Sequence, residues 1–228
     1  MAERWHQGAT RWHRLAGLLL LWASGVSGLL SPHQTQAEPL PQMLRIVPDS
    51  PHGQAILREA WTYFLAQPGV PTGPAQEPVR LVVVFDPDCP YCHDLWLGLQ
   101  HAGTSEIRIR WVPVAFVRPA TLNKAAAIIS APDPAKALTL NETHFDSVHH
   151  EGGLLPLYTV APGLAEAIRG STRRWRTLVG LLPAMLYRKP GERVVKIIAG
   201  VPPRVRLDAL MTALGGKPVS GLAAGASP

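Results

Sequence analysis

The segment Leu81-Val82-Val83-Val84-Phe85-Asp86-Pro87-Asp88-Cys89-Pro90-Tyr91-Cys92-His93 decides the fold of this chain. Its first five residues are apolar and rich in β-branched side chains, the pattern of a central strand that is covered on both faces. Asp86-Pro87 ends that run, and Pro90 suits the first turn of a helix, where its missing N–H costs nothing. The segment therefore predicts a buried strand, a short turn and a helix that begins at a Cys-x-x-Cys pair.

The two cysteines of this pair differ in their expected chemistry. Cys89 falls at the helix N-terminus, where free backbone N–H groups and the helix dipole favour a thiolate over a thiol. Such a position lowers a cysteine pKa from ~8.5 into the range of ~3.5–7.5. We predict a redox-active pair in which Cys89 is the better exposed, attacking sulfur. Cys92, one turn further on, is expected to resolve the mixed disulfide.

Other interpretations of the pair stay open at this point. These are the only two cysteines in 228 residues, so a structural zinc site would need ligands from elsewhere, such as His93 and a second histidine. Two unrelated buried cysteines are the simplest alternative. We expect His93 to face solvent rather than the Cys89 thiolate, and we expect no metal at the histidines of residues 144–150. Asp88 would oppose thiolate formation if it points inward, and its direction is left open.

The segment Phe85–His93 closely resembles the active site of the DsbC/DsbG-like thiol-disulfide interchange proteins, bacterial periplasmic members of the thioredoxin superfamily. The resemblance extends more loosely from Val79 to Gly215. It includes Ala125-Ala126-Ala127-Ile128, Asp133-Pro134-Ala135-Lys136, Leu182-Pro183-Ala184 and Gly200-Val201-Pro202. The resemblance implies disulfide exchange with protein substrates through Cys89-Pro90-Tyr91-Cys92, with no cofactor and no metal.

The resemblance also implies a substrate-binding surface. In that family the proline that opens the third strand is cis and lies against the Cys-x-x-Cys pair, and Pro183 occupies this position. Relatives usually carry Thr or Val before it, whereas Leu182 offers an extended substrate only backbone groups. We expect Pro183, Leu182, Pro90 and Tyr91 to contact the substrate. An ordinary proline at the start of a strand is the alternative for Pro183.

Periodicity and breakers predict the order β–α–β–helices–β–β–α, which is that of an α/β, thioredoxin-like fold with a helical insertion at about residues 118–180. The resemblance implies that this insertion lies between the second strand and the cis-proline strand. Residues 68–78, rich in proline and glycine, are expected to form a linker or loop. Expected helices cover residues 52–66, 121–130, 133–145, 162–179 and 203–214, the fourth interrupted or frayed near Gly170. Expected strands cover 107–111, with a continuation past Pro113, and the hairpin 182–187 and 194–199.

The chain ends suggest export and a simple domain order. Residues 1–37 combine arginines, the uncharged run 15–30 and small residues before Glu38, as in a cleaved secretory signal; an uncleaved membrane anchor is the alternative. Residues 38–78 would hold one helix and a proline-rich linker, 79–215 the thioredoxin-like domain, and 216–228 a flexible tail. The net charge of +6 is spread out and predicts no nucleic-acid partner. We interpret the arginines of residues 169–176 as a solvated face, with an acidic partner or anionic lipid as the alternative.

The sequence thus predicts a periplasmic thiol-disulfide oxidoreductase. Its expected partners are cysteine-containing periplasmic proteins and a membrane redox partner that resets the disulfide. A structural docking subunit of an envelope assembly and a metal-binding thiol protein are the alternatives. The 41 residues from 38 to 78 are short for the family's N-terminal dimerisation domain, so a monomer is expected and isomerase activity is left open.

Overall fold

The computed structural model describes residues 50–217. The predicted signal, its cleavage site, the lead-in up to residue 49 and residues 218–228 of the predicted tail lie outside this range. In chain order the elements are α1 (Pro51–Ala66), β1 (Val70–Thr72), β2 (Leu81–Phe85), α2 (Pro90–His101), β3 (Ile109–Pro113), α3 (Thr121–Ser130), α4 (Pro134–Thr143), α5 (Pro162–Leu178), β4 (Ala184–Tyr187), β5 (Lys196–Ala199) and α6 (Arg204–Ala213).

The strands form one mixed sheet with the order β1-β3-β2-β4-β5. Strand β2 lies at the centre, parallel to β3 and antiparallel to β4. Parallel neighbours need a crossover, and α2 supplies it between β2 and β3. Helices α3, α4 and α5 fill the long connection from β3 to β4, where the sequence predicted a helical insertion.

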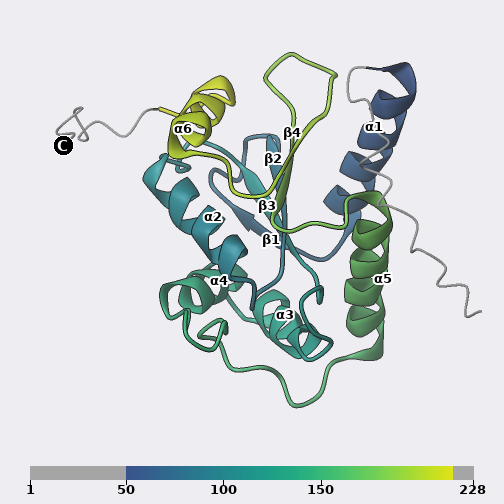
Figure 1. Ribbon diagram of the computed structural model, residues 1–228, viewed down its shortest axis with the longest axis vertical. Coiled ribbons are helices and arrows are strands. Elements are labelled where there is room, and N and C mark those ends of the chain that lie inside the picture. The colour runs from purple at the N-terminus through teal and green to yellow at the C-terminus, as the bar shows by residue number, and fades with distance from the viewer. Residues whose placement is uncertain (1–49, 218–228) are drawn as a thin grey trace, which may run out of the picture. The chain divides into compact units, whose positions relative to one another are not determined.

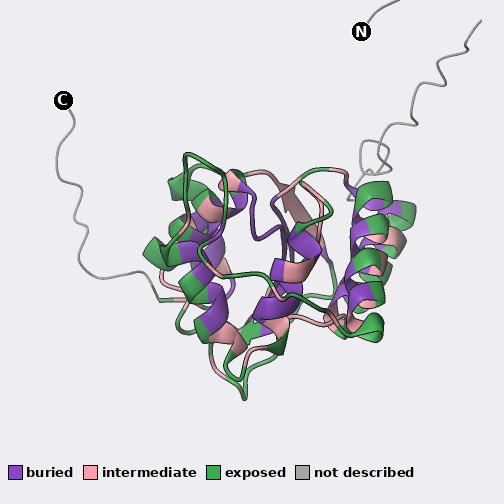
Figure 2. Cartoon of the chain, turned by 90° about the horizontal axis from the view of Figure 1, so that it is seen from below, coloured by how far each residue is buried: buried purple, intermediate pink, exposed green. Residues whose placement is uncertain are grey.

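Strand β2 is buried on both faces, as its unbroken apolar run predicted. Leu81, Val83 and Phe85 pack in one cluster with residues of α2 and α6. Val82 and Val84 point the other way and pack with α1 and α5. Figure 1 shows these two pairs of helices on opposite sides of the sheet, and Figure 2 shows their buried residues turned inward. The strand therefore holds both layers together and delivers its C-terminal end to the Cys-x-x-Cys turn.

The expected linker at residues 68–78 contains a strand that the sequence interpretation missed. Val70 is fully buried, and β1 pairs antiparallel with β3 at the sheet edge. An edge strand tolerates Pro71, which lacks an N–H for the ladder. Gly73 then turns the chain with φ +80°, and a Cβ there would lie 2.1 Å from the Ile107 carbonyl oxygen. The prolines and glycines thus serve an edge strand and its turn, not a free linker.

Helix α5 runs without a break through Gly170, so the predicted interruption there was wrong. A Cβ at Gly170 would sit 3.5 Å from the Tyr63 hydroxyl of α1, so the glycine lies where two helices face each other. The remaining boundaries moved by a few residues: β3 ends at Pro113, β4 begins at Ala184, after the proline, and β5 begins at Lys196.

Trp175 fastens α5 to the segment before β4. It is fully buried, meets Phe64 edge to face at 5.2 Å between ring centroids, and its Nε1 donates to the Leu181 carbonyl at 2.8 Å. Trp175→Phe removes this hydrogen bond and leaves a cavity, so the free energy of unfolding should fall by about 1–3 kcal/mol. Urea denaturation measures it, with the exposed Tyr158→Phe as control. Equal stability of both variants would contradict the role of Trp175.

Candidate active site

The Cys-x-x-Cys turn has the predicted local structure. Cys89 is the N-cap of α2 with extended backbone angles, and Pro90 follows in the first turn. The Cys89 amide donates to the Asp86 carbonyl at 3.0 Å, while the Cys89 carbonyl accepts from the His93 amide at 3.1 Å. Both cysteines are free thiols. They are buried, with exposed fractions of 5% for Cys89 and 2% for Cys92, so the expected contrast in exposure is small.

The two thiols differ strongly in their electrostatics. The pKa of Cys89 lies below its ordinary value, chiefly because its sulfur accepts a hydrogen bond from the Cys92 thiol. The backbone N–H groups of Cys92 and Tyr91 lower this pKa further, while burial opposes them. Burial raises the pKa of Cys92 well above its ordinary value, and its hydrogen bond to Cys89 adds to that rise. Cys89 is thus the thiol that ionises first.

Asp86 is a fully buried carboxylate at the end of β2. Its Oδ2 accepts from the backbone amides of Phe116 at 2.6 Å and Val117 at 2.8 Å, and its Oδ1 from the Asp88 amide at 2.9 Å. Its own amide donates to the Cys92 sulfur at 3.4 Å. Desolvation outweighs these hydrogen bonds and raises the pKa of Asp86 to about 6. This carboxylate shapes the turn and places a titrating charge beside the Cys92 thiol.

The side chain of Asp88 points into the helical insertion. Its Oδ1 accepts from Lys124 Nζ at 2.6 Å and from the Gly152 amide at 3.0 Å, and its Oδ2 from the Thr121 hydroxyl at 3.1 Å. Arg118 Nε lies 3.5 Å from Oδ2 without the geometry of a hydrogen bond, so it contributes only its charge. The direction that the sequence left open is therefore toward α3, where a buried lysine meets the carboxylate.

His93 does not face solvent, contrary to the expectation. Its side chain is 16% exposed, its ring stacks on Phe145 at 4.6 Å between centroids, and its Nδ1 lies 3.3 Å from Glu142 Oε2. Burial raises the pKa of Glu142, and the hydrogen bond from His93 opposes that rise. His93 therefore connects α2 to α4. Its partners lie in α4 and just after the end of that helix, and the sequence could not place this segment against α2.

The four residues predicted to contact the substrate differ in how far they are exposed to solvent. Tyr91 is 63% exposed, and Pro90 beside it is partly exposed. Leu182 is partly buried and packs against the cluster that contains both cysteines. Pro183 is buried, and the Leu182–Pro183 peptide bond is cis, which confirms that expectation. Their contact with a substrate stays a prediction.

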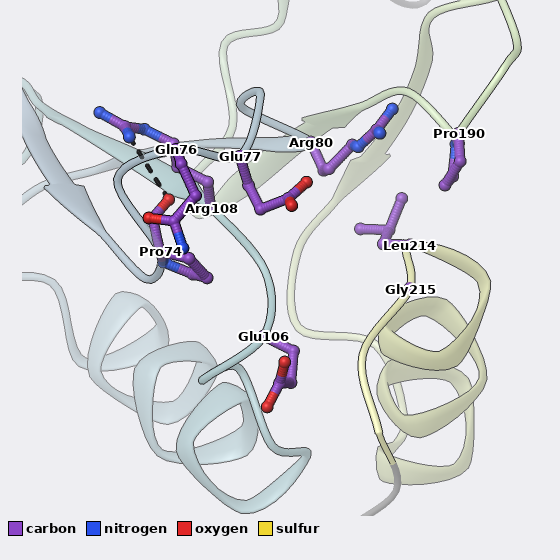
Figure 3. Close-up of a pocket in the computed structure, with 9 residues that line it drawn as sticks. All are labelled: Pro74, Gln76, Glu77, Arg80, Glu106, Arg108, Pro190, Leu214 and Gly215. Atoms are coloured by element: carbon purple, nitrogen blue, oxygen red, sulfur yellow. Dashed lines mark hydrogen bonds between the residues drawn. The ribbon is translucent and has the colours of Figure 1, made fainter.

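Two cavities lie apart from these residues. One, of about 350 Å³, opens beside Arg80, at the opposite end of β2 from Cys89. Five residues of strand span roughly 17 Å, which separates this cavity from the thiols. Figure 3 shows it, with Arg108 bonded to the Pro74 carbonyl at 3.3 Å. The other, of about 410 Å³, is lined by arginines of α5 and by residues around Pro119 and α3.

Among the described residues, the side chains of His101, His144 and His149 have polar partners close to them in sequence. His149 Nδ1 lies 2.7 Å from Asp146 Oδ2, which raises the pKa of His149 and lowers that of Asp146 to about 2. Within residues 50–217 no group of three or more His, Cys, Asp and Glu side chains is placed to hold a metal ion. Over the same residues, no helix combines the length and apolar character needed to cross a membrane.

Three polar residues near the cysteines escaped the sequence interpretation: Lys124, Asn141 and Glu142. All three are buried within the insertion. Lys124 carried a signal, because it is the one charged residue in Thr121–Ser130 and precedes Ile128 by four positions, on the same helix face as a core residue. Asn141 and Glu142 carried none, since their burial depends on how α4 packs.

Sequence comparison finds two relatives with the same function name. The chain is 25% identical over 159 residues to the thiol:disulfide interchange protein DsbG of Escherichia coli, and 25% identical over 135 residues to that of Pseudomonas aeruginosa. The chain resembles the DsbC/DsbG group. This confirms the resemblance predicted from Phe85–His93. The matches cover 68% and 58% of this chain, but only 61% and 51% of the two DsbG chains. No protein-family model matches the chain.

Solved structures confirm the fold. A periplasmic thioredoxin-like protein of Salmonella enterica serovar Typhimurium superposes with a TM-score of 0.52 at 20% identity, covering 68% of this chain and 96% of that one. ScsC of Proteus mirabilis superposes with a TM-score of 0.53 at 16% identity, covering 70% and 78%. The thioredoxin-like fold with inserted helices, predicted from the order of elements, is therefore the fold of this chain.

Proposed function

We propose that this protein is a thiol-disulfide oxidoreductase that exchanges disulfides with cysteine-containing protein substrates. The observation that carries the proposal is the unequal ionisation of two adjacent thiols. The pKa of Cys89 is lowered at a helix N-terminus, and the pKa of Cys92 is raised by burial. The similarity to the DsbG proteins of two bacteria supports the same chemistry.

The exchange proceeds through a mixed disulfide. The Cys89 thiolate attacks one sulfur of a substrate disulfide, forms a Cys89–substrate bond and releases the other substrate sulfur as a thiolate. Cys92 then loses its proton and attacks Cys89, which releases the second substrate thiolate and leaves a Cys89–Cys92 disulfide. The substrate gains two electrons and the protein loses two. The reverse sequence oxidises a substrate dithiol.

The substrate surface is proposed to include Tyr91, Pro90, Leu182 and Pro183. Tyr91 is largely exposed beside Cys89, and Leu182 packs against the cluster that holds both cysteines. An extended peptide could bond to the Leu182 backbone while Tyr91 contacts its side chains. The client proteins would be recognised by accessible cysteines rather than by one sequence.

Export to the periplasm through residues 1–37 and resetting by a membrane redox partner complete the proposal. The basic, apolar and small-residue order of that segment supports export. A monomer is proposed because α1 buries Leu57, Trp61 and Phe64 against the sheet and α5 of its own domain. Its apolar face therefore has no need of a second subunit.

Reduction of insulin by dithiothreitol tests the proposal. The protein should accelerate precipitation of the insulin B chain, and Cys89→Ala should return the rate to that of dithiothreitol alone. Tyr158→Phe, on a fully exposed side chain, controls for handling of variants. A wild-type rate no higher than the uncatalysed rate would refute the function. Recovery of the purified protein as a zinc complex that blocks both thiols would favour the metal-binding alternative.

A further inference from the structure

Residues of the helical insertion make polar contacts with three residues around Cys89. The Asp88 carboxylate accepts hydrogen bonds from Lys124, Thr121 and the Gly152 amide. The Pro87 carbonyl accepts from the Asn141 side chain at 3.0 Å. His93 meets Glu142. Of these three contacts, the one at Asp88 is the nearest to the nucleophile in the chain, because Asp88 directly precedes Cys89.

The Asp88–Lys124 contact is a buried ion pair. Asp88 is 5% exposed and Lys124 is 6% exposed, so both ions have left water. Such burial is costly unless the geometry is good and further hydrogen bonds complete it. Here Lys124 Nζ also donates to the Gly152 carbonyl at 2.8 Å, while the Gly152 amide donates to Asp88. Lys124 thereby closes a ring through the turn, α3 and the loop at residue 152.

We propose that Asp88 and Lys124 are positioning residues that hold the Cys89 turn against the insertion, and that Lys124 balances the negative charge of Asp88, the residue directly before Cys89. The inference deepens the proposed function and rests on it only in taking Cys89 as the nucleophile. Both side chains are buried, so they act through the turn and not by contact with a substrate. Their pairing fixes the direction of the turn, and their balanced charges set the field in which Cys89 ionises.

The charges around the pair leave Lys124 as the main counter-ion. Arg118, on the segment before α3, approaches Asp88 but is 38% exposed and divides its charge with Glu151. Asp86 and Glu142 are buried acids on the other sides of the turn, and burial raises the pKa of each. Removing Lys124 would therefore leave an acidic neighbourhood, whereas removing the Asp88 charge would leave a buried cation.

Opposite substitutions should move the pKa of Cys89 in opposite directions. Lys124→Met leaves Asp88 unbalanced and should raise the pKa of Cys89 by about 0.5 or more. Asp88→Asn leaves Lys124 unbalanced and should lower it by a similar amount. The double variant Asp88→Asn/Lys124→Met should return to within about 0.25 of the Cys89 pKa in the protein that carries neither substitution, measured on the same background, since its net charge is restored.

The rate of iodoacetamide alkylation against pH, on the reduced proteins with Cys92→Ala, gives this pKa without any protein substrate. Lys136→Met and Asp208→Asn, on exposed positions of α4 and α6, are the matched controls and should leave the pKa unchanged. If Lys124→Met does not fold, Asp88→Asn and the double variant still give a fall and its reversal. The inference would be overturned if both single variants shifted the pKa of Cys89 in the same direction, or if neither shifted it. If the two single variants shift the Cys89 pKa in opposite directions but the protein does not reduce insulin, the proposed function is refuted and the role of Asp88 and Lys124 stands.

Discussion

Cys92→Ala should stop the exchange at the mixed disulfide, while Cys89→Ala should prevent the exchange from starting. The pKa of Cys92 is well above its ordinary value and that of Cys89 is below it, so a substrate meets the Cys89 thiolate first. Without Cys92 no neighbouring thiol attacks the bond between Cys89 and the substrate. Turnover in insulin reduction should fall by at least on the order of 10³-fold in either variant, because the two sulfurs act as one unit.

Non-reducing electrophoresis distinguishes the two variants. In cells that produce Cys92→Ala, covalent complexes should appear that collapse on addition of dithiothreitol, and mass spectrometry should place the bond at Cys89. Cys89→Ala should give none, and the variant lacking both cysteines controls for background. Complexes of equal yield in both single variants would show that the buried Cys92 is reachable by substrates. The assignment of roles would then be wrong.

The central part of the fold could be predicted because local signals and burial agree there. The run Leu81–Phe85 is apolar on both faces, and its neighbours on both faces are helices. The Asp-Pro dipeptide and Pro90 then fixed the turn and the helix start within one residue. At these positions the residue type alone indicates burial, a turn or a helix start, so they could be predicted without knowledge of tertiary contacts.

The errors lie where tertiary contacts override local composition. Val70–Thr72 reads as a linker because Pro71 and two glycines surround it, yet pairing with β3 makes it a strand. Gly170 reads as a helix breaker, yet packing of α5 against α1 keeps the helix intact. In both cases a partner distant in sequence supplies hydrogen bonds or apolar contact that a short window does not contain.

The sequence predicts the two reacting cysteines of the site, but it does not predict the residues that hold them in place. Cys89 and Cys92 announce themselves by spacing, but Asp86 resembles an ordinary strand terminator and His93 an exposed helix residue. The partners of Asp86, the amides of Phe116 and Val117, lie about thirty residues away in an irregular segment. Backbone donors carry no sequence signature. A buried carboxylate that depends on them can be recognised only once the chain is folded.

Asp86 should make the protein less stable as the pH rises from 4 to 7. Its pKa is about 6 in the folded state, against 3.8 for the unfolded chain. Because the folded value is the higher one, the folded state binds the proton more tightly. That stabilisation is complete below the unfolded pKa and is lost as the pH passes the folded pKa. A pKa difference of one between the two states corresponds to about 1.4 kcal/mol, so the change between pH 4 and 7 should be about 2 kcal/mol.

Asp86→Asn isolates this contribution, because asparagine has nearly the same size and does not titrate. Urea unfolding of both proteins, reduced with a phosphine, gives the difference in unfolding free energy at each pH. The wild type should lose about 2 kcal/mol relative to Asp86→Asn between pH 4 and 7. Asp94→Asn, on an exposed position of α2, controls for the loss of one carboxylate. A difference that stays constant with pH would contradict the raised pKa.

The free-energy cost of ionising the buried Asp86 is partly offset by the hydrogen bonds that its carboxylate accepts in the turn. Its two oxygens accept three backbone N–H groups, from Asp88, Phe116 and Val117, and each of these would lose its partner on truncation. The Asp88 amide is buried, and a buried donor without a partner costs about 1–3 kcal/mol, whereas the hydrogen bonds from Phe116 and Val117 are only part-buried. Asp86→Ala should therefore destabilise the protein at every pH, by about 1–3 kcal/mol. At neutral pH the ionised carboxylate also repels the Cys89 and Cys92 thiolates and raises the pKa of both thiols. Asp86 therefore raises the pKa of the thiols while its oxygens hold the turn through these hydrogen bonds. Asp86→Ala removes the hydrogen bonds and the charge together. Asp86→Asn removes the charge but also replaces one acceptor oxygen by an NH2 group, so only the pH dependence of its stability reports the charge.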